Sequence, residues 1–285
     1  MDDMKDIQWF PGHMAKTRRQ ITKSLPLVDA AAELLDARLP MSSHNPELKK
    51  LTGKKPRLVI LNKADMADPN VTAQWVSYYK KQGFAVITAD SKSGKGVKQF
   101  APALRELLKD QLAKYAEKGM KGRPIRVMIL GIPNVGKSSL INRLAGGKRA
   151  KAEDRAGVTR TQQWIKTQDG VELLDTPGVL WPKLDDQEVA VRLAMTGAIR
   201  DGILDQEALA ARLLTFLHTE YPQAVAERYK IAKEQDGTGF ELLELMAKNR
   251  GMLLSGGVPN TERAAITLLD EFRGAKLGRI SLEKP

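Results

Sequence analysis

Short apolar runs, each ending in polar or glycine-rich residues, dominate the first two thirds of the chain. These runs cover residues 28–35, 57–61, 85–88, 125–130 and 171–174. Nearly continuous apolar runs of this length predict strands that are buried on both faces of a sheet. Helical patterns over 14–25, 71–81 and 99–118 separate them. The alternation predicts an α/β fold: a mostly parallel sheet with helices on both faces.

The pattern changes near residue 186, after which only helical periodicity remains. The predicted helices cover 189–200, 206–220, 224–234, 240–250 and 261–273. Leucines at helical spacing, such as Leu209, Leu213 and Leu217, predict the core of a helical bundle. We therefore expect two domains, an α/β domain over 1–183 and an all-helical domain over 184–285.

Composition limits the class of protein. The chain of 285 residues has no cysteine, which excludes disulfides and thiolate metal sites and fits a reducing cytoplasm. No apolar run approaches the roughly eighteen residues of a membrane span, so no membrane partner is expected. The acidic start, with Asp2, Asp3 and Asp6, is typical of neither a signal peptide nor a transit peptide. We expect a cytoplasmic protein.

Net charge is +12, and its distribution is uneven. Residues 1–185 carry 33 Lys and Arg against 19 Asp and Glu, whereas the remaining hundred residues carry 13 against 15. A basic half of this kind would hold a polyanion such as RNA through its phosphates. The alternative is a basic surface without a specific partner.

A phosphate-binding loop follows the apolar run at 125–130. Gly131-Ile-Pro-Asn-Val-Gly-Lys-Ser138 fits the pattern GxxxxGK[ST] between a strand and a helix. Gly131 and Gly136 allow successive backbone N–H groups to point into one concavity, and the helix that follows adds its positive end. Lys137 can then neutralise the β- and γ-phosphates, and the Ser138 hydroxyl can ligate magnesium.

Guanine recognition is predicted by Asn62-Lys-Ala-Asp65, which ends the strand at 57–61. Polar side chains there emerge at a strand's carboxyl end, where open α/β sheets bind ligands. Asp65 offers two acceptors in the plane of guanine's two donors, Asn62 can hold the base edge or tie loops together, and the Lys63 stem can cover the ring. Asp90-Ser-Lys92 fits the loop that lays a backbone N–H against the guanine oxygen. Ordinary GTPases have Ser-Ala-Lys there, which leaves the side-chain detail open.

Asp175-Thr-Pro-Gly178 after the strand at 171–174 completes a GTP site. Asp175 would hold magnesium through a water, and the Gly178 N–H can touch the γ-phosphate. The motif order is unusual, because Asn62 precedes Gly131 in the chain. A parallel sheet tolerates this, since strand order in space fixes the site and loops can be re-joined where termini lie close.

This permuted order resembles the circularly permuted ribosome-assembly GTPases, and the resemblance covers essentially the whole chain. It rests on the three motifs above and on further blocks. These are residues 9–16 (WFPGHMAK), 36–38 (DAR), 42–46 (SSHNP), 163–164 (QW), 174–182 (LDTPGVLWP) and 272–279 (FRGAKLGR). It implies a GTPase that binds the large ribosomal subunit precursor and its RNA and acts as a nucleotide-dependent checkpoint in late maturation. A tRNA-modification GTPase competes with this interpretation, although the chain lacks cysteine and any modification domain. A GTP-binding scaffold that does not hydrolyse is the third alternative.

The resemblance also implies roles for single residues. Thr159 would be the second magnesium contact, with Thr161 as the alternative. Asn134 would hold a potassium ion beside the phosphates, as in potassium-stimulated GTPases, or would brace the loop. Val179 replaces the glutamine with which some GTPases orient water, so hydrolysis would be slow alone and stimulated by the particle. His13 would position the water, or else cap its helix or contact RNA.

The predicted residues form four sets. The guanine-nucleotide contacts are Asn62, Lys63, Ala64, Asp65, Asp90, Ser91, Asn134, Val135, Gly136, Lys137, Ser138, Ser139 and Gly178. The catalytic residues are His13, Lys137 and Thr159, and the metal contacts are Ser138, Thr159 and Asp175 for magnesium and Asn134 for potassium. The RNA contacts are Lys16, Arg18, Arg19, Lys148, Arg149, Lys151 and Arg155, the last four in a basic loop that could instead be solvated and disordered. We expect a monomer away from the particle.

Overall fold

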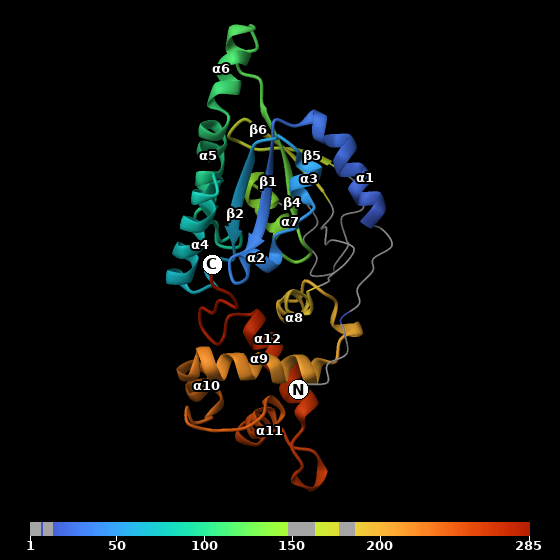
Figure 1. Cartoon of the computed structure of the whole chain (residues 1–285), viewed down its shortest axis with the longest axis vertical. Coiled ribbons are helices and arrows are strands. Elements are labelled where there is room, and N and C mark those ends of the chain that lie inside the picture. The colour runs from blue at the N-terminus through green and yellow to red at the C-terminus, as the bar shows by residue number, and fades with distance from the viewer. Residues whose placement is uncertain (1–6, 8–13, 148–162, 177–185) are drawn as a thin grey trace. The chain divides into compact units, whose positions relative to one another are not determined.

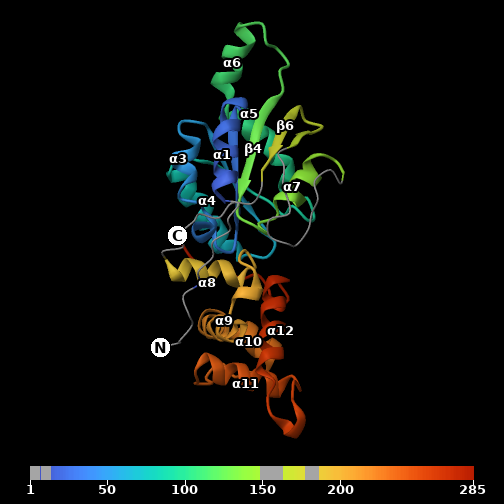
Figure 2. The ribbon, with the colours of Figure 1, turned by 90° about the vertical axis from the view of Figure 1, so that its right-hand side faces the viewer.

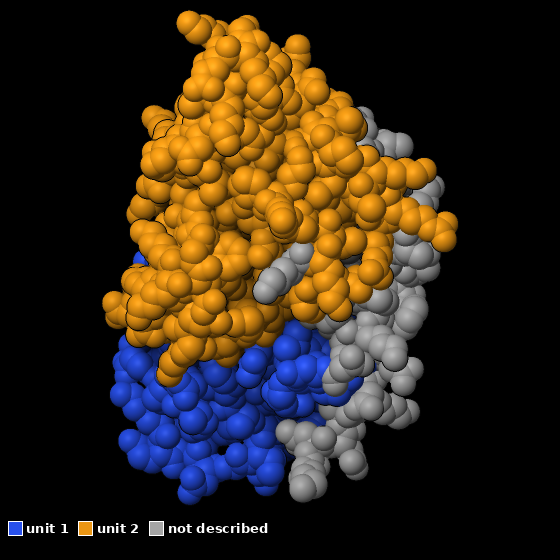
Figure 3. All heavy atoms as spheres, turned by 45° about the horizontal axis from the view of Figure 1, so that its top comes forward, with its two compact units in different colours: residues 1–9, 184–280 blue, residues 10–183, 281–285 orange. Residues whose placement is uncertain are grey.

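The structure is a computed structural model that describes residues 7, 14–147, 163–176 and 186–285. Its chain divides into two compact units, shown in Figure 3. The first, the sheet unit, comprises residues 10–183 and 281–285, and the second, the helical unit, comprises 1–9 and 184–280. Residues 281–285 therefore pack with the sheet unit, whereas the sequence analysis placed all of 184–285 in the helical domain.

The sheet unit is built on a six-stranded sheet with the order β3-β2-β1-β4-β6-β5. The strands are β1 Ala30–Asp36, β2 Arg57–Asn62, β3 Ala85–Thr88, β4 Ile125–Gly131, β5 Gln163–Lys166 and β6 Val171–Asp175. All neighbours are parallel except β5, which pairs antiparallel with β6. The predicted mostly parallel sheet is confirmed. Strand β5 was not predicted, because its four residues include Gln163 and Lys166 and carry too little apolar pattern.

Helices cover both faces of this sheet (Figure 2). One face carries α1 Met14–Ser24, α3 Leu48–Thr52 and α4 Pro69–Lys81, and the other carries α5 Phe100–Leu107 and α7 Lys137–Leu144. Ile21 of α1 packs with Ala31 and Met128 of the sheet, while Trp75 of α4 packs with Leu35 and Val59. Helix α6 Lys109–Glu117 continues from α5, and α2 Pro40–Ser43 is a single turn after β1.

The helix predicted over 99–118 is wrong as one element. It consists of α5 and α6, because Leu108 leaves helical geometry with φ −107° and ψ 9°. The helix predicted over 224–234 also ends early, as α10 Pro222–Tyr229, where Lys230 takes φ 59°. A left-handed residue of this kind ends a helix.

The helical unit is organised around α9 Gln206–Glu220, which contacts the four other helices of the unit. These are α8 Gln187–Met195, α10, α11 Gly239–Asn249 and α12 Thr261–Arg273 (Figure 1). Leu209, Leu213 and Leu217 are fully buried, which confirms the predicted bundle core. Helix α11 approaches α9 closely at Gly239, where a Cβ would lie 2.4 Å from the Ala211 carbonyl oxygen.

No helix among the described residues combines the length and apolar character needed to cross a membrane.

Candidate functional site

The carboxyl ends of β1, β2 and β4 meet at one edge of the sheet. Asp36 at the end of β1 lies beside Asn62 at the end of β2, and Leu34 lies beside Gly131 at the end of β4. Asp175 at the end of β6 lies beside Ile129. Parallel register thus brings the predicted phosphate, base and magnesium motifs to the same edge, where open α/β sheets bind ligands.

The phosphate loop has the backbone geometry that anion binding needs. Asn134 has φ 57° and Gly136 has φ 97°, and α7 begins directly at Lys137. Alternating left- and right-handed residues before a helix point backbone N–H groups into one concavity. At Gly131 a Cβ would lie 3.0 Å from the Leu34 carbonyl oxygen, so glycine allows the loop to pack against β1.

Asn62 joins the phosphate loop to the base loop. Its Nδ2 donates to the Val135 carbonyl at 2.7 Å, and its Oδ1 accepts from the Ser91 N–H at 3.1 Å and the Ser91 Oγ at 2.7 Å. Asn62 is only 1% exposed. A Cβ at Gly136 would lie 2.4 Å from that same Nδ2, so the second loop glycine is required by Asn62 as well as by its φ. Asn62 thus ties the two loops together, and its other expected role at the base edge stays a prediction.

The remaining base motif surrounds this tie. Asp65 is exposed and so accessible to a base, while the Ala64 N–H donates to the Ala89 carbonyl at 3.1 Å. Lys63 has φ 57° and its Nζ lies 3.1 Å from Asp36 Oδ2. The Asp90 carboxylate accepts from the Lys92 N–H at 2.8 Å and the Ser93 N–H at 3.1 Å. This chain therefore uses the carboxylate that replaces serine to brace its own loop.

Lys137 and Asp175 are both buried, and the charge of each acts on the pKa of the other. Burial lowers the pKa of Lys137, and the Asp175 charge only partly offsets this. Burial raises the pKa of Asp175 above its ordinary value, against the Lys137 charge and a backbone N–H from Thr176. Both side chains are thus costly to keep charged until a ligand of complementary charge binds.

The donor set fits magnesium. Asp175 Oδ1 is buried and has no hydrogen-bond partner among the described residues. Magnesium takes oxygen ligands and keeps several waters, so Ser138 would ligate it and the free Asp175 oxygen would hold one of those waters. When bound, the ion neutralises charge on the β- and γ-phosphates. Lys137 would then lie on the phosphates, and the loop N–H groups would surround them.

Several predicted residues lie outside the described part of the chain. These are His13, Lys148, Arg149, Lys151, Arg155, Thr159 and Gly178. Lys16 lies on α1, where Arg18 and Arg19 are exposed, and Arg18 pairs with Glu47 at 3.3 Å. Asn134 is exposed at the phosphate loop, and Ser138 and Ser139 are half-buried at the start of α7. Val135 is buried.

Sequence reasoning missed Arg143. Its guanidinium on α7 donates to the Lys92 carbonyl, and its side chain packs where a Cβ at Gly94 would lie 3.1 Å away. It thereby ties the phosphate-loop helix to the loop that follows β3. Nothing in the local pattern marks an arginine on the exposed side of a helix for such a role.

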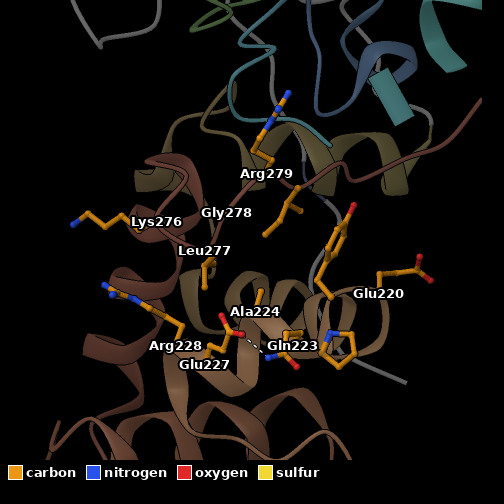
Figure 4. Close-up of a pocket in the computed structure, with 12 residues that line it drawn as sticks. Glu220, Gln223, Ala224, Glu227, Arg228, Lys276, Leu277, Gly278 and Arg279 are labelled. Atoms are coloured by element: carbon orange, nitrogen blue, oxygen red, sulfur yellow. Dashed lines mark hydrogen bonds between the residues drawn. The ribbon is translucent and has the colours of Figure 1, made fainter. Parts of the chain in front are cut away.

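The helical unit carries a separate recess of about 640 Å³ (Figure 4). Residues of α9, α10 and the segment after α12 line it, among them Glu220, Glu227, Arg228, Lys276 and Arg279. Its charges are mixed, and Arg228 is already paired with Glu271. None of its residues belongs to the predicted nucleotide, metal or RNA sets.

Known proteins resemble this chain over nearly its whole length. Residues 126–235 match a family described as "50S ribosome-binding GTPase". Ribosome biogenesis GTPase A of Bacillus cereus is 49% identical over 98% of this chain and 94% of its own length. The GDP-bound structure of TM YlqF is 32% identical, with a TM-score of 0.66 over 94% of this chain and 99% of that chain. The crystal structure of GNP-bound YlqF from T. maritima is 31% identical, with a TM-score of 0.65 over 95% of this chain and 98% of that chain.

The predicted permuted phosphate-loop fold and the predicted GTP hydrolysis are confirmed together. The base motif precedes the phosphate loop in the chain, yet β2 and β4 stand on either side of β1 in the sheet. Similarity at this level covers nearly the full length of both chains, the helical unit included. This chain is therefore a circularly permuted GTPase, converting GTP to GDP and phosphate, and it belongs to the ribosome biogenesis GTPase A family.

Proposed function

We propose that this GTPase binds the precursor of the large ribosomal subunit and acts as a nucleotide-dependent checkpoint in its late maturation, in the cytoplasm. The observation that carries the proposal is a guanine-nucleotide site within the strongly basic half of the chain, where Lys and Arg number 33 against 19 acids. A basic surface beside a nucleotide site lets the bound nucleotide control contact with RNA. The matched family description and the relatives' names support a ribosomal partner.

Phosphate release with and without purified large-subunit precursors tests this function. We expect slow release from the protein alone and faster release with large-subunit precursors, but no change with small subunits at the same RNA concentration. Equal release in all three reactions would contradict the checkpoint. A pull-down at increasing salt measures the RNA contacts, because affinity falls with a log–log slope of roughly 0.7 to 0.9 per phosphate contact.

Exposed arginines on α1 offer a direct test of RNA binding. Replacing Arg18 and Arg19 with alanine should weaken precursor binding and flatten the salt dependence. Lys109 is the matched control, since it is exposed on α6 and pairs with Glu106 at 2.8 Å. An equal loss of precursor binding in Lys109→Ala would mean that overall charge, and not α1, determines binding.

His13 is our proposal for the group that positions the attacking water. Val179 follows the Asp175 motif and cannot orient water, so another residue or a partner would supply the water-positioning group. His13→Ala should retain GTP binding and lose on the order of a hundredfold in precursor-stimulated turnover, the usual size of such a loss. If the particle-bound His13→Ala variant turns over GTP at the wild-type rate, His13 has a structural role.

We also propose that Asn134 helps to hold a potassium ion beside the phosphates. It is exposed in the phosphate loop, three residues before the start of α7, and has a left-handed φ of 57°. An added positive charge there would act as an arginine finger does in other GTPases. Equal turnover in potassium and sodium chloride at matched ionic strength would leave Asn134 as a loop brace.

A further inference from the structure

A buried ion cluster lies behind the base motif. Asp36, at the end of β1, accepts from Arg38 Nε at 2.9 Å and Arg38 Nη2 at 2.7 Å. The Lys63 Nζ lies 3.1 Å from the same carboxylate. Asp36 and Arg38 are 2% and 1% exposed, so the cluster is closed to water on that side. We propose that Asp36 is a positioning residue for guanine nucleotides, which holds the Lys63 stem in the place where it covers the purine ring.

The need for such a residue follows from the chemistry of lysine. Its flexible side chain loses rotamer entropy when it is ordered, and nucleotide binding must otherwise supply that free energy. An ammonium group already anchored to Asp36 leaves the stem ordered before the base arrives. Preorganisation of this kind raises affinity without adding a contact to the ligand.

The electrostatics favour a permanent anchor. Burial raises the pKa of Asp36, but Arg38 and Lys63 outweigh it and hold the pKa well below its usual range. Burial also lowers the pKa of Lys63, with Arg38 acting in the same direction and Asp36 against both. The Asp36 carboxylate therefore stays ionised at neutral pH. Without it, two cations would face each other in a buried environment.

The C-terminal segment Ser281–Pro285 supports the cluster from outside. The Leu282 N–H donates to the Arg38 carbonyl at 2.7 Å. Glu283 caps α2, accepting from the Met41 and Ser42 N–H groups and from the Ser42 hydroxyl. In Figures 1 and 2 this end of the chain lies beside α4, whose Trp75 Nε1 donates to the Glu283 carbonyl at 3.2 Å.

The segment Ser281–Pro285 holds the backbone at Arg38 in place. Leu282 is buried, and Ser281 Oγ accepts from the Asp68 N–H at 3.2 Å, three residues after the base motif. The chain end thus closes over both Arg38 and the segment that follows Asp65. We assign it the role of outer support for the same positioning.

Asp36→Asn is the primary test, because it preserves shape and removes only the charge. We expect GDP to dissociate about tenfold faster, with the preference for guanine over xanthine unchanged, since Asp65 and not Lys63 reads the base. Asp29→Asn is the matched control. Asp29 is also buried, directly before β1, and pairs with Arg123 at 2.9 Å, but it lies at the opposite end of the strand.

Lys63→Met keeps an apolar stem and completes a double-mutant cycle. The two substitutions together should cost no more than either alone, because both break the same pair. Additive losses would overturn the proposal, and so would an Asp36→Asn variant that releases GDP as slowly as wild type. Equal loss in Asp36→Asn and Asp29→Asn would show general destabilisation and would also overturn it.

Deletion of 281–285 tests the outer support. We expect the deletion to make GDP dissociation several-fold faster when it is introduced into the wild-type chain. Introduced into the Asp36→Asn variant, it should leave the dissociation rate of that variant unchanged. Glu283→Gln is the milder variant should the deletion fail to fold, since it weakens the cap of α2 and leaves the chain intact. A deletion that melts at a lower temperature but releases GDP at the wild-type rate would remove this role from the segment.

Discussion

Replacing Asn62 with alanine should uncouple the phosphate loop from the base loop. The substitution leaves the Val135 carbonyl and the Ser91 N–H and hydroxyl without the partner they share. Each net hydrogen bond contributes about 1 kcal/mol, and a buried group left unpaired costs about 1 to 3 kcal/mol. Water can enter the vacated space and satisfy part of this set. We therefore expect a loss of about 2 to 4 kcal/mol in the free energy of unfolding.

Nucleotide affinity should fall as well, because GDP must then order two loops that Asn62 holds together in advance. Denaturant unfolding gives the stability, and titration with fluorescent GDP gives the affinity. Asn62→Asp should be worse than alanine, since a second oxygen would face the Val135 carbonyl where Nδ2 now donates.

Asn249→Ala is the matched control. Its Nδ2 donates to the carbonyls of Tyr229 at 3.0 Å and Lys230 at 2.9 Å, in the helical unit. We expect lower stability of that unit with GDP affinity unchanged. The reasoning is refuted if Asn62→Ala binds GDP as tightly as wild type, or if Asn249→Ala loses as much GDP affinity as Asn62→Ala.

Two further predictions concern the base and the metal. Asp65→Asn should weaken GTP binding and gain affinity for xanthosine triphosphate, which competition binding measures; unchanged GTP affinity would remove Asp65 from the base contact. Asp175→Asn should melt no lower than wild type without nucleotide, yet lose the magnesium dependence of its GTP affinity. The sign follows from burial, which raises the Asp175 pKa above its ordinary 3.8 and makes the ionised form costly at higher pH. Its contribution to stability therefore falls as pH rises from 3.8 through the raised pKa. A lower melting temperature at pH 7 with intact magnesium dependence would contradict this role.

The loops of the site could be predicted from sequence because their chemistry is local. Gly131, Gly136 and Lys137 specify their own turn, and the apolar strands before them decide which edge of the sheet they reach. The helical stripe of Leu209, Leu213 and Leu217 is equally local. Periodicity and turn residues carry this information within a few positions of chain.

Contacts between distant segments could not be predicted in the same way. Arg143 reaches Lys92 across 51 positions, and Leu282 reaches Arg38 from the other end of the chain. Their side chains carry no periodic or motif signal, since only the packed sheet brings them together. The break at Leu108 was missed for a related reason: its leucine stripe continues across it, and no glycine or proline marks the point.

The packing of Ser281–Pro285 on the sheet unit has a consequence for the order in which the chain can fold. Strands β1, β2 and β3 are synthesised before the other strands and are neighbours in the sheet, so half of it can assemble while synthesis continues. The segment that closes over Arg38 follows the whole helical unit in the chain, so it is translated well after these strands. A growing chain can therefore form its base motif early, but the support behind Lys63 is completed only once the helical unit has been made. Full guanine-nucleotide affinity then depends on a segment that joins the sheet unit after all of its strands.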